Sequence, residues 1–206
     1  MKIGPKYKIA RRLGADVFEK TQGPKFMLSE ARKSKNAVRG KRRKMLSDYG
    51  KQLLEKQKVR FTYGIGEKQF KNIVKGAVSQ KAGDAKEVLY ESLESRLDNT
   101  VYRLSLSPTR RMARQMVSHG HITVNGRKLT IPSYNVREGD KIGIRNGSKD
   151  KAMFVNLDDK IKEGGSIPSW LKFDLPKREA VIQGRPKLKP GESLLDLNTV
   201  IEFYSK

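Results

Sequence analysis

The stretch SPTRRMARQMVSHGHITVNGRKLTI, residues 107–131, joins the signal for a short helix to the signal for a β-hairpin. Pro108 or Thr109 marks the helix start, because proline suits the first helical position and threonine caps a helix, and Gly120 lies just past the helix end. The dipeptide Asn125-Gly126 favours a two-residue hairpin turn, in which both residues need positive φ. The stretch therefore predicts a helix that leads directly into two short antiparallel strands.

Each of these elements has an apolar side and a polar side. The predicted helix buries Met112, Ala113, Met116 and Val117 and presents Arg110, Arg111, Arg114 and Gln115 on its other side. Pairing across a two-residue turn gives the hairpin a core face made of Ile122, Val124, Leu129 and Ile131. The opposite face carries His121, Thr123, Lys128 and Thr130. The stretch thus presents a block of guanidinium groups beside a partly basic hairpin.

Amphipathic segments continue on both sides of this stretch. Leucine and valine recur at helical spacing over residues 85–104, which predicts one long helix, and two shorter basic helices are predicted from Ser47 and after Gly66. A further strand is predicted at Lys141–Ile144, and the ending NTVIEFYSK, 198–206, alternates as a short terminal strand or extended segment would. Two helices followed by a small antiparallel sheet form an α+β module.

The charge of the chain narrows the classes of partner. The 206 residues include 45 Lys plus Arg and 22 Asp plus Glu, which gives a formal net charge of +23. A charge of that size indicates a polyanionic partner, with nucleic acid favoured over a membrane surface. The longest apolar run is AMFV, Ala152–Val155, much shorter than the roughly 20 residues of a spanning helix. The first residues contain no apolar signal segment, so we expect a cytoplasmic protein.

Half of the excess positive charge lies in the opening segment. Residues 1–46 carry 15 Lys or Arg against 3 Asp or Glu, and KRRK at Lys41–Lys44 is its densest cluster. A solvated tail or a localisation signal is one interpretation of such a cluster. The apolar anchors Phe18, Phe26 and nearby residues favour the other, a basic arm that becomes ordered on RNA.

Catalytic and metal chemistry have few candidate residues. The chain has no cysteine, and its only histidines are His119 and His121, on the two sides of the predicted helix-to-strand corner. A metal ion would need further ligands, so we expect no metal site, no cofactor and no catalytic residue. The imidazoles either face RNA as donors or stacking planes, or simply cap the structure.

Several segments carry a resemblance to a known family. RLDNTVYRL (96–104), residues 107–134 and VREGDKI (136–142) resemble the S-four RNA-binding domain. That domain also occurs in pseudouridine synthases, in some tyrosyl-tRNA synthetases and in a ribosome-associated heat-shock protein. The flanking segments resemble the bacterial ribosomal protein S-four family in the same order, so the likeness covers nearly the whole chain; these segments are 3–14, 47–70, 168–171 and 200–206.

The resemblance implies an α+β fold with an inserted domain and a ribosomal role. It implies a basic N-terminal arm at 1–46, a helical domain at 47–93 completed by 165–206, and the RNA-binding domain at 94–164. Family members bind the 5′ domain of 16S rRNA and nucleate assembly of the small-subunit body. They also contact ribosomal protein S-five, at an interface linked to translational accuracy, and help line the channel through which messenger RNA enters. Some members hold zinc through opening-segment cysteines, but this chain has Tyr7 and Ala10 in that segment.

Two alternatives from other classes remain. An RNA-modifying enzyme of the pseudouridine synthase type needs a catalytic aspartate in a motif resembling HRLDxxTSG, whereas Asp98 here lacks the preceding histidine and the Ser-Gly. Asp98 is interpreted instead as an intrahelical partner of a nearby arginine. A helix-turn-helix regulator would place residues 110–114 in a DNA major groove, but the hairpin that follows argues against it.

The candidate RNA-binding residues are basic, aromatic or amide side chains spread over all three segments. They are Lys6, Arg11, Arg12, Arg42, Arg43, Lys44, Tyr49, Lys51, Lys56, Lys58, Arg60, Arg96, Arg103, Arg110, Arg111, Arg114, His119, His121, Asn125, Arg127 and Lys128. Arginine suits phosphate because its planar fork meets two oxygens at once. We expect Arg111→Glu combined with Arg114→Glu to abolish RNA binding without unfolding the protein.

Overall fold

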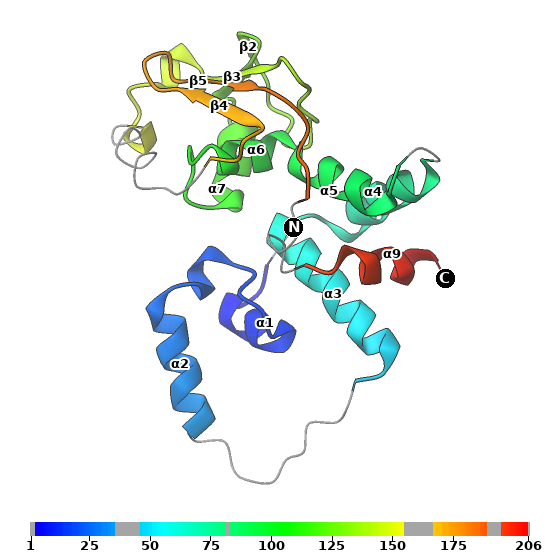
Figure 1. The fold of residues 1–206 in the computed structure, drawn as a ribbon. Helices are drawn as coiled ribbons and strands as arrows, with labels where there is room; N and C mark the ends of the chain where they lie inside the picture. Colours follow the sequence, from blue (N-terminus) through cyan, green and yellow to red (C-terminus); the bar gives the residue numbers. More distant parts are fainter. Residues whose placement is uncertain (1–2, 36–45, 81–82, 155–166, 189–194, 206) are drawn as a thin grey trace. The chain divides into compact units, whose positions relative to one another are not determined.

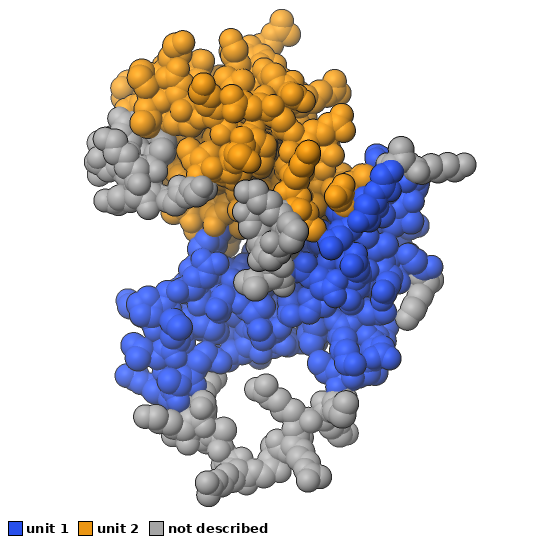
Figure 2. Space-filling view, viewed as in Figure 1, with its two compact units in different colours: residues 1–86, 189–206 blue, residues 87–188 orange. Residues whose placement is uncertain are grey.

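The computed structural model describes residues 3–35, 46–80, 83–154, 167–188 and 195–205. The chain forms two compact units (Figure 2). Unit 1 contains residues 1–86 and 189–206, and unit 2 contains residues 87–188. The described residues form helices and one antiparallel sheet, so the predicted α+β class is confirmed.

Unit 1 is helical in its described part. Its elements are α1 (Lys6–Leu13), the 3₁₀ helix η1 (Glu19–Thr21), α2 (Pro24–Lys35), α3 (Asp48–Tyr63), α4 (Glu67–Ser79) and α9 (Leu197–Ser205). Ser47 caps α3 as predicted, since its Oγ accepts a hydrogen bond from the Gly50 N–H at 3.2 Å. The predicted helices after Ser47 and Gly66 are therefore confirmed as α3 and α4.

The opening segment packs against α3 through a small apolar cluster. Leu13, Val17 and Phe18 are buried, and Leu54 and Phe61 of α3 pack against them. The Phe18 and Phe61 rings meet edge to face at 6.0 Å between centroids. Residues 3–35 of the predicted arm are thus mostly helical and share an apolar cluster with α3.

The prediction of a terminal strand is wrong, because the C-terminal residues form helix α9 beside α3 and α4 (Figure 1). Leu197 and Val200 are buried three residues apart, a spacing that serves one face of a helix. Asp196 supplies the helix start, because its carboxylate accepts from the Thr199 N–H at 3.1 Å and from the Thr199 hydroxyl at 2.6 Å. The short apolar pattern of this segment fits both the two-residue period of a strand and the 3.6-residue period of a helix. The cap at Asp196 favours the helix.

Unit 2 places helices against one face of a five-stranded sheet (Figure 1). These helices are α6 (Leu97–Arg103) and α7 (Arg110–Ser118), and α5 (Ala85–Glu94), which starts in unit 1, precedes them in the chain. The strands are β1 (Ile122–Val124), β2 (Arg127–Lys128), β3 (Lys141–Ile144), β4 (Leu171–Asp174) and β5 (Glu179–Ile182), in the order β2-β1-β3-β5-β4. Two 3₁₀ turns, η2 (Asn146–Ser148) and η3 (Ala152–Phe154), follow β3. Apolar side chains of α6, α7 and the sheet form one core.

The predicted boundary at residue 165 requires a correction. Strand β5 pairs with β3, with Ile142 opposite Ala180, and β4 pairs with β5. Leu171, Ala180 and Ile182 are buried in the unit 2 core. Residues 171–182, which were assigned to the helical domain, therefore complete the sheet, because their alternating apolar residues fit its edge. Of the described elements after residue 165, only α9 belongs to unit 1.

The predicted helix over residues 85–104 is two helices. Arg96 has extended backbone angles, φ −65° and ψ 136°, and forms a β-bridge with Asn135. The Leu97 N–H donates to the carbonyl of Tyr134 at 2.8 Å, and the Val136 N–H donates to the carbonyl of Ser95 at 2.8 Å. The leucine spacing runs across this break, so the apolar pattern alone did not reveal it.

The predicted hairpin is confirmed in register but not in all of its faces. Val124 pairs with Arg127 across a turn in which Asn125 has φ +52° and Gly126 has φ +77°. Ile131, predicted to face the core, is 53% exposed, since β2 ends at Lys128 and the alternation stops with it.

Candidate nucleic-acid interface

The arginines of α7 are presented by a well-capped helix. The Thr109 side chain accepts a hydrogen bond from the Met112 N–H at 3.1 Å, which confirms Thr109 as the cap. Ala113, Met116 and Val117 of this helix are buried, as predicted, while Arg111 is exposed. Arg111 therefore lies open to solvent, whereas Arg110 and Arg114 of the same helix are half-buried.

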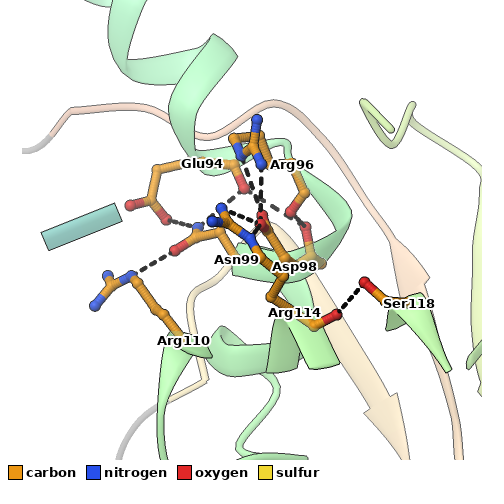
Figure 3. Close-up of polar contacts among 8 residues, drawn as sticks. Glu94, Arg96, Asp98, Asn99, Arg110, Arg114 and Ser118 are labelled. Atoms are coloured by element: carbon orange, nitrogen blue, oxygen red, sulfur yellow. Dashed lines mark hydrogen bonds and ion pairs between the residues drawn. The ribbon is translucent and has the colours of Figure 1, made fainter. Parts of the chain in front are cut away.

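Two of the predicted arginines converge on one buried carboxylate, that of Asp98 (Figure 3). Arg96 donates from Nε to Oδ1 at 3.1 Å and from Nη2 to Oδ2 at 2.9 Å. Arg114, which comes from α7, donates to Oδ2 from Nε at 2.8 Å and from Nη2 at 2.6 Å. Asp98 thus has the expected arginine partners, but the contact is not intrahelical as predicted, because Arg96 is the extended N-cap residue of α6 and Arg114 belongs to α7.

A second buried carboxylate, that of Glu94, holds another part of the same cluster. Arg103 donates to it from Nε and from Nη2, both at 2.8 Å. Asn99 donates from Nδ2 to Glu94 at 2.9 Å and accepts from Arg110 Nε at 2.9 Å. The Arg110 guanidinium also lies 4.3 Å from the centroid of the Tyr102 ring, in cation–π geometry.

The arginines of this cluster differ in how far they are exposed to solvent. The Arg96 side chain is only 4% exposed, so its predicted place on an open basic surface is corrected to a buried position beside Asp98. Arg103 and Arg114 remain 33% and 29% exposed. The sequence did not identify Glu94, Asn99 or Tyr102, and the one available signal was a glutamate within an apolar helical stripe.

Three of the predicted RNA-binding residues belong to the hairpin, and they differ in exposure and in hydrogen bonding. Arg127 and Lys128 are exposed. The aliphatic part of the Lys128 side chain packs against Gly120, which lies between α7 and β1. A Cβ at Gly120 would lie 2.2 Å from Lys128 Cε. The Asn125 side chain is engaged within the protein, since it donates to Asp140 at 2.8 Å and accepts from the Lys141 N–H at 2.9 Å. Asn125 therefore stabilises the turn.

The candidates on α3 are mostly engaged in ion pairs within unit 1. Lys51 pairs with Asp48 at 3.0 Å, Lys58 pairs with Glu55 at 2.6 Å, and Arg60 pairs with Glu67 at 3.1 Å. Lys56 is 6% exposed and pairs with Glu67 at 2.7 Å. Tyr49 is exposed and its ring lies 5.7 Å from that of Phe203.

The Lys56 pair is enclosed by the C-terminal helix. The Lys56 ammonium lies 4.5 Å from the Phe203 ring centroid, and the Tyr204 hydroxyl donates to Glu67 at 2.8 Å. Burial raises the pKa of Glu67, but the hydrogen bonds from Lys56 and Tyr204 and the charges of Lys56 and Arg60 lower the pKa below its usual value overall. Lys56 is thus placed as a link between α3 and α9 and not as an open cation.

The opening helices hold the remaining described candidates. Lys6 lies over the Phe18 ring at 5.7 Å, and Arg11 pairs with Glu30 and donates to Ser29 at 2.8 Å. Arg12 is exposed. The other three predicted cations of this segment, Arg42, Arg43 and Lys44, lie outside the described residues.

The two histidines occupy different environments. His119 is the exposed C-cap of α7, as its place after the arginine helix predicted. His121, predicted on the outer face of the hairpin, is buried, because the chain turns back through η2 and brings the Ser148 hydroxyl to 2.9 Å from its Nδ1. The rings lie 6.2 Å apart. Only His119 therefore remains accessible to RNA.

The setting of His121 predicts a pH dependence of stability. Burial, assisted by the positive charges of Lys151, Arg145 and His119, lowers the pKa of His121 below its ordinary value of 6.5. The unfolded chain then binds the proton more readily, so the free energy of unfolding should fall as pH drops from about 7.5 to about 5.5. Urea denaturation at several pH values measures this. His121→Gln should flatten the dependence, whereas His119→Gln, which removes the smallest of these contributions, should preserve most of it; an unchanged slope in His121→Gln would contradict the assignment.

Neither a metal-binding cluster nor a membrane-spanning helix occurs among the residues that the structure describes. Within the described residues, no three His, Cys, Asp or Glu side chains gather in a way that could hold a metal ion. No helix in the described ranges is long and apolar enough to cross a membrane.

Comparison with known proteins assigns both parts of the chain. Residues 1–94 match the family model of the ribosomal protein S4/S9 N-terminal domain, and residues 95–142 match that of the S4 domain. The small ribosomal subunit protein uS4 of Chromobacterium violaceum is 43% identical over 99% of this chain and 98% of its own length. Its namesake in Chloroflexus aurantiacus is 40% identical over 99% of this chain and 98% of its own length. The chain therefore belongs to the ribosomal protein S4 family, as its sequence motifs had indicated.

Proposed function

We propose that this chain is a structural constituent of the small ribosomal subunit that binds 16S rRNA. The observation that carries the proposal is the likeness, over nearly the full length of both chains, to proteins named as small ribosomal subunit proteins. The S4 domain match covers the segment that holds Arg103, Arg110, Arg111 and Arg114. The net charge of +23 agrees with a polyanionic partner.

The exposed cations of unit 2 suit the recognition of folded RNA. A-form helices hide their base edges in a deep, narrow major groove, so proteins contact them mainly through phosphates, 2′-hydroxyls and shape. Arg111, Arg127 and Lys128 are exposed, and the guanidinium of Arg114 is partly exposed. These side chains would meet phosphate oxygens at a junction of RNA helices.

The finer role follows from the family to which the chain belongs. It would attach to the 5′ domain of 16S rRNA early in assembly, nucleate the body of the subunit, and contact ribosomal protein S-five and messenger RNA near the channel through which the message enters. Its place would be the small subunit, which is cytoplasmic in bacteria. This family is not an enzyme class, and we propose no catalytic activity; an RNA-modifying role is disfavoured.

The decisive experiment compares the affinity for the 16S 5′ domain with that for duplex DNA at about 150 mM salt. Specific binding predicts a preference for the RNA of at least about three decades, and affinity for RNA should fall by roughly three to five decades between 50 and 200 mM salt if about eight phosphates are contacted. Filter binding of the full chain measures both. Equal affinity for the two nucleic acids would contradict the proposal.

A further inference from the structure

We propose that Glu94 and Asp98 are positioning residues for RNA binding: the two buried carboxylates hold Arg103 and Arg114 in the orientation that meets the phosphates. The inference rests on the proposed function. It concerns acidic side chains, whose negative charge would by itself repel the phosphates of RNA. Their burial beneath arginines is what gives them this role.

The geometry separates a buried acidic layer from an accessible basic one. The side chains of Glu94 and Asp98 are 1% and 5% exposed, whereas those of Arg103 and Arg114 are 33% and 29% exposed. Each of these arginines meets its carboxylate through both Nε and Nη2 (Figure 3 for Arg114 and Asp98). A ligand that approaches this cluster therefore meets guanidinium groups before it meets a carboxylate.

The cluster is anchored to the backbone and so cannot rotate freely. The Asp98 N–H donates to the carbonyl of Pro132 at 3.1 Å, and the Asn99 side chain donates to the carbonyl of Glu94 at 3.1 Å. Asn99 in turn holds the Nε of Arg110, which stacks over Tyr102. Arginines from the end of α6 and from α7 are thus fixed by one short segment, residues 94–99.

The charge of the cluster remains favourable to RNA. The cluster contains four guanidiniums, those of Arg96, Arg103, Arg110 and Arg114, and two carboxylates, so four minus two leaves a net charge of +2. A free arginine side chain loses rotamer freedom when it binds a phosphate, and an arginine that is already fixed loses less. The fixed orientation of these arginines therefore offsets the attraction for phosphate that the two carboxylates cancel.

Stability alone is a weaker explanation for these acids. Buried ion pairs often stabilise a protein no better than apolar residues of similar volume, because two charges must be removed from water. The cluster instead fixes the direction of side chains at the surface. If the carboxylates orient the arginines, their removal should weaken RNA binding. If they act only through their negative charge, their removal should strengthen it.

The test uses this difference in sign. Asp98→Asn removes a negative charge, so charge alone predicts tighter RNA binding, whereas loss of positioning predicts binding weaker by roughly threefold to tenfold. Glu138→Gln is the matched control, since Glu138 is an exposed carboxylate of the same unit outside the cluster. This control should bind the 16S 5′ domain as tightly as the unaltered chain, or slightly more tightly.

Glu94→Gln keeps the test valid if Asp98→Asn does not fold, because the partly exposed Arg103 can turn toward water. Circular dichroism establishes the folded fraction, and affinity is expressed per folded protein. The Nε–H signal of the released arginine in ¹H–¹⁵N spectra should lose its protection from exchange in each variant.

The outcomes separate the two proposals. Failure of the unaltered chain to bind the 16S 5′ domain would overturn the proposed function. If that chain binds, and folded Asp98→Asn or Glu94→Gln binds equally well or more tightly, the positioning role is wrong. Weaker binding of the folded variants, with Glu138→Gln unaffected, supports it.

Discussion

Reversal of three exposed charges, Arg111→Glu, Arg127→Glu and Lys128→Glu, is expected to weaken binding of the 16S 5′ domain by at least about two decades at 150 mM salt. Each cation that meets a phosphate releases about one counterion, so the slope of log affinity against log salt should fall by about three. Filter binding over a series of salt concentrations measures both quantities. The effect follows from the exposed positions of these residues on α7 and β2.

The folded state should survive this triple change. All three side chains are exposed, and surface substitutions away from special features usually change the free energy of unfolding by about 0.5 kcal/mol or less. The control is Lys172→Glu, Lys177→Glu and Lys187→Glu, which alters net charge equally within unit 2 at other exposed positions. If the two triple variants lose the same affinity, binding depends on overall charge and the assigned surface is incorrect.

The pair that the sequence suggested, Arg111 and Arg114, is a poor choice for this purpose. Arg114 forms two hydrogen bonds with the buried Asp98, so Arg114→Glu would set one carboxylate against another and remove a partner from a buried charge. Asp98 would keep Arg96 as its partner, but a second carboxylate beside it would repel its charge. We therefore expect Arg111→Glu combined with Arg114→Glu to destabilise the folded protein, and Arg127 and Lys128 take the place of Arg114 in the triple variant.

The second large effect concerns unit 1. Phe70→Ala should lower the free energy of unfolding by about 3–5 kcal/mol, the usual range for deleting a buried aromatic ring. Phe70 is fully buried, and its ring meets that of Tyr204 in α9 at 6.1 Å between centroids. The cavity would thus lie where α4 meets the C-terminal helix. Urea denaturation followed by far-ultraviolet circular dichroism measures the change.

Met27→Ala provides the comparison within the same unit. The Met27 side chain is 67% exposed on α2, so its removal should change the free energy of unfolding by no more than about 0.5 kcal/mol. Comparable losses in the two variants would mean that Phe70 is not part of a tightly packed core.

Short-range signals in the sequence were sufficient for much of unit 2. Asn125-Gly126 fixed the hairpin register, and Thr109 fixed the start of α7, because a turn and a cap depend on a few adjacent residues. The basic character of α7 also followed from composition alone. Each of these signals lies within a few adjacent residues of the sequence.

The errors arose where distant segments compete for the backbone. Arg96 looked helical by spacing, but the strand-like segment at Asn135 pairs with it and breaks the helix. Residues 171–182 carried no signal of their partner strand, Lys141–Ile144. Arg96 and Lys56 looked like surface cations because a residue type does not reveal the carboxylate that it meets after folding.

The link between α3 and α9 has a consequence for the timing of biosynthesis. Lys56 contacts Phe203 and pairs with Glu67, to which Tyr204 donates, so unit 1 is completed by residues that are translated after unit 2. All of unit 2 is translated in between. At about 5–20 residues per second, α3 waits on the order of ten seconds for its partner helix. The nascent chain can therefore finish its five-stranded sheet while its first-made helices still lack the helix that packs against them.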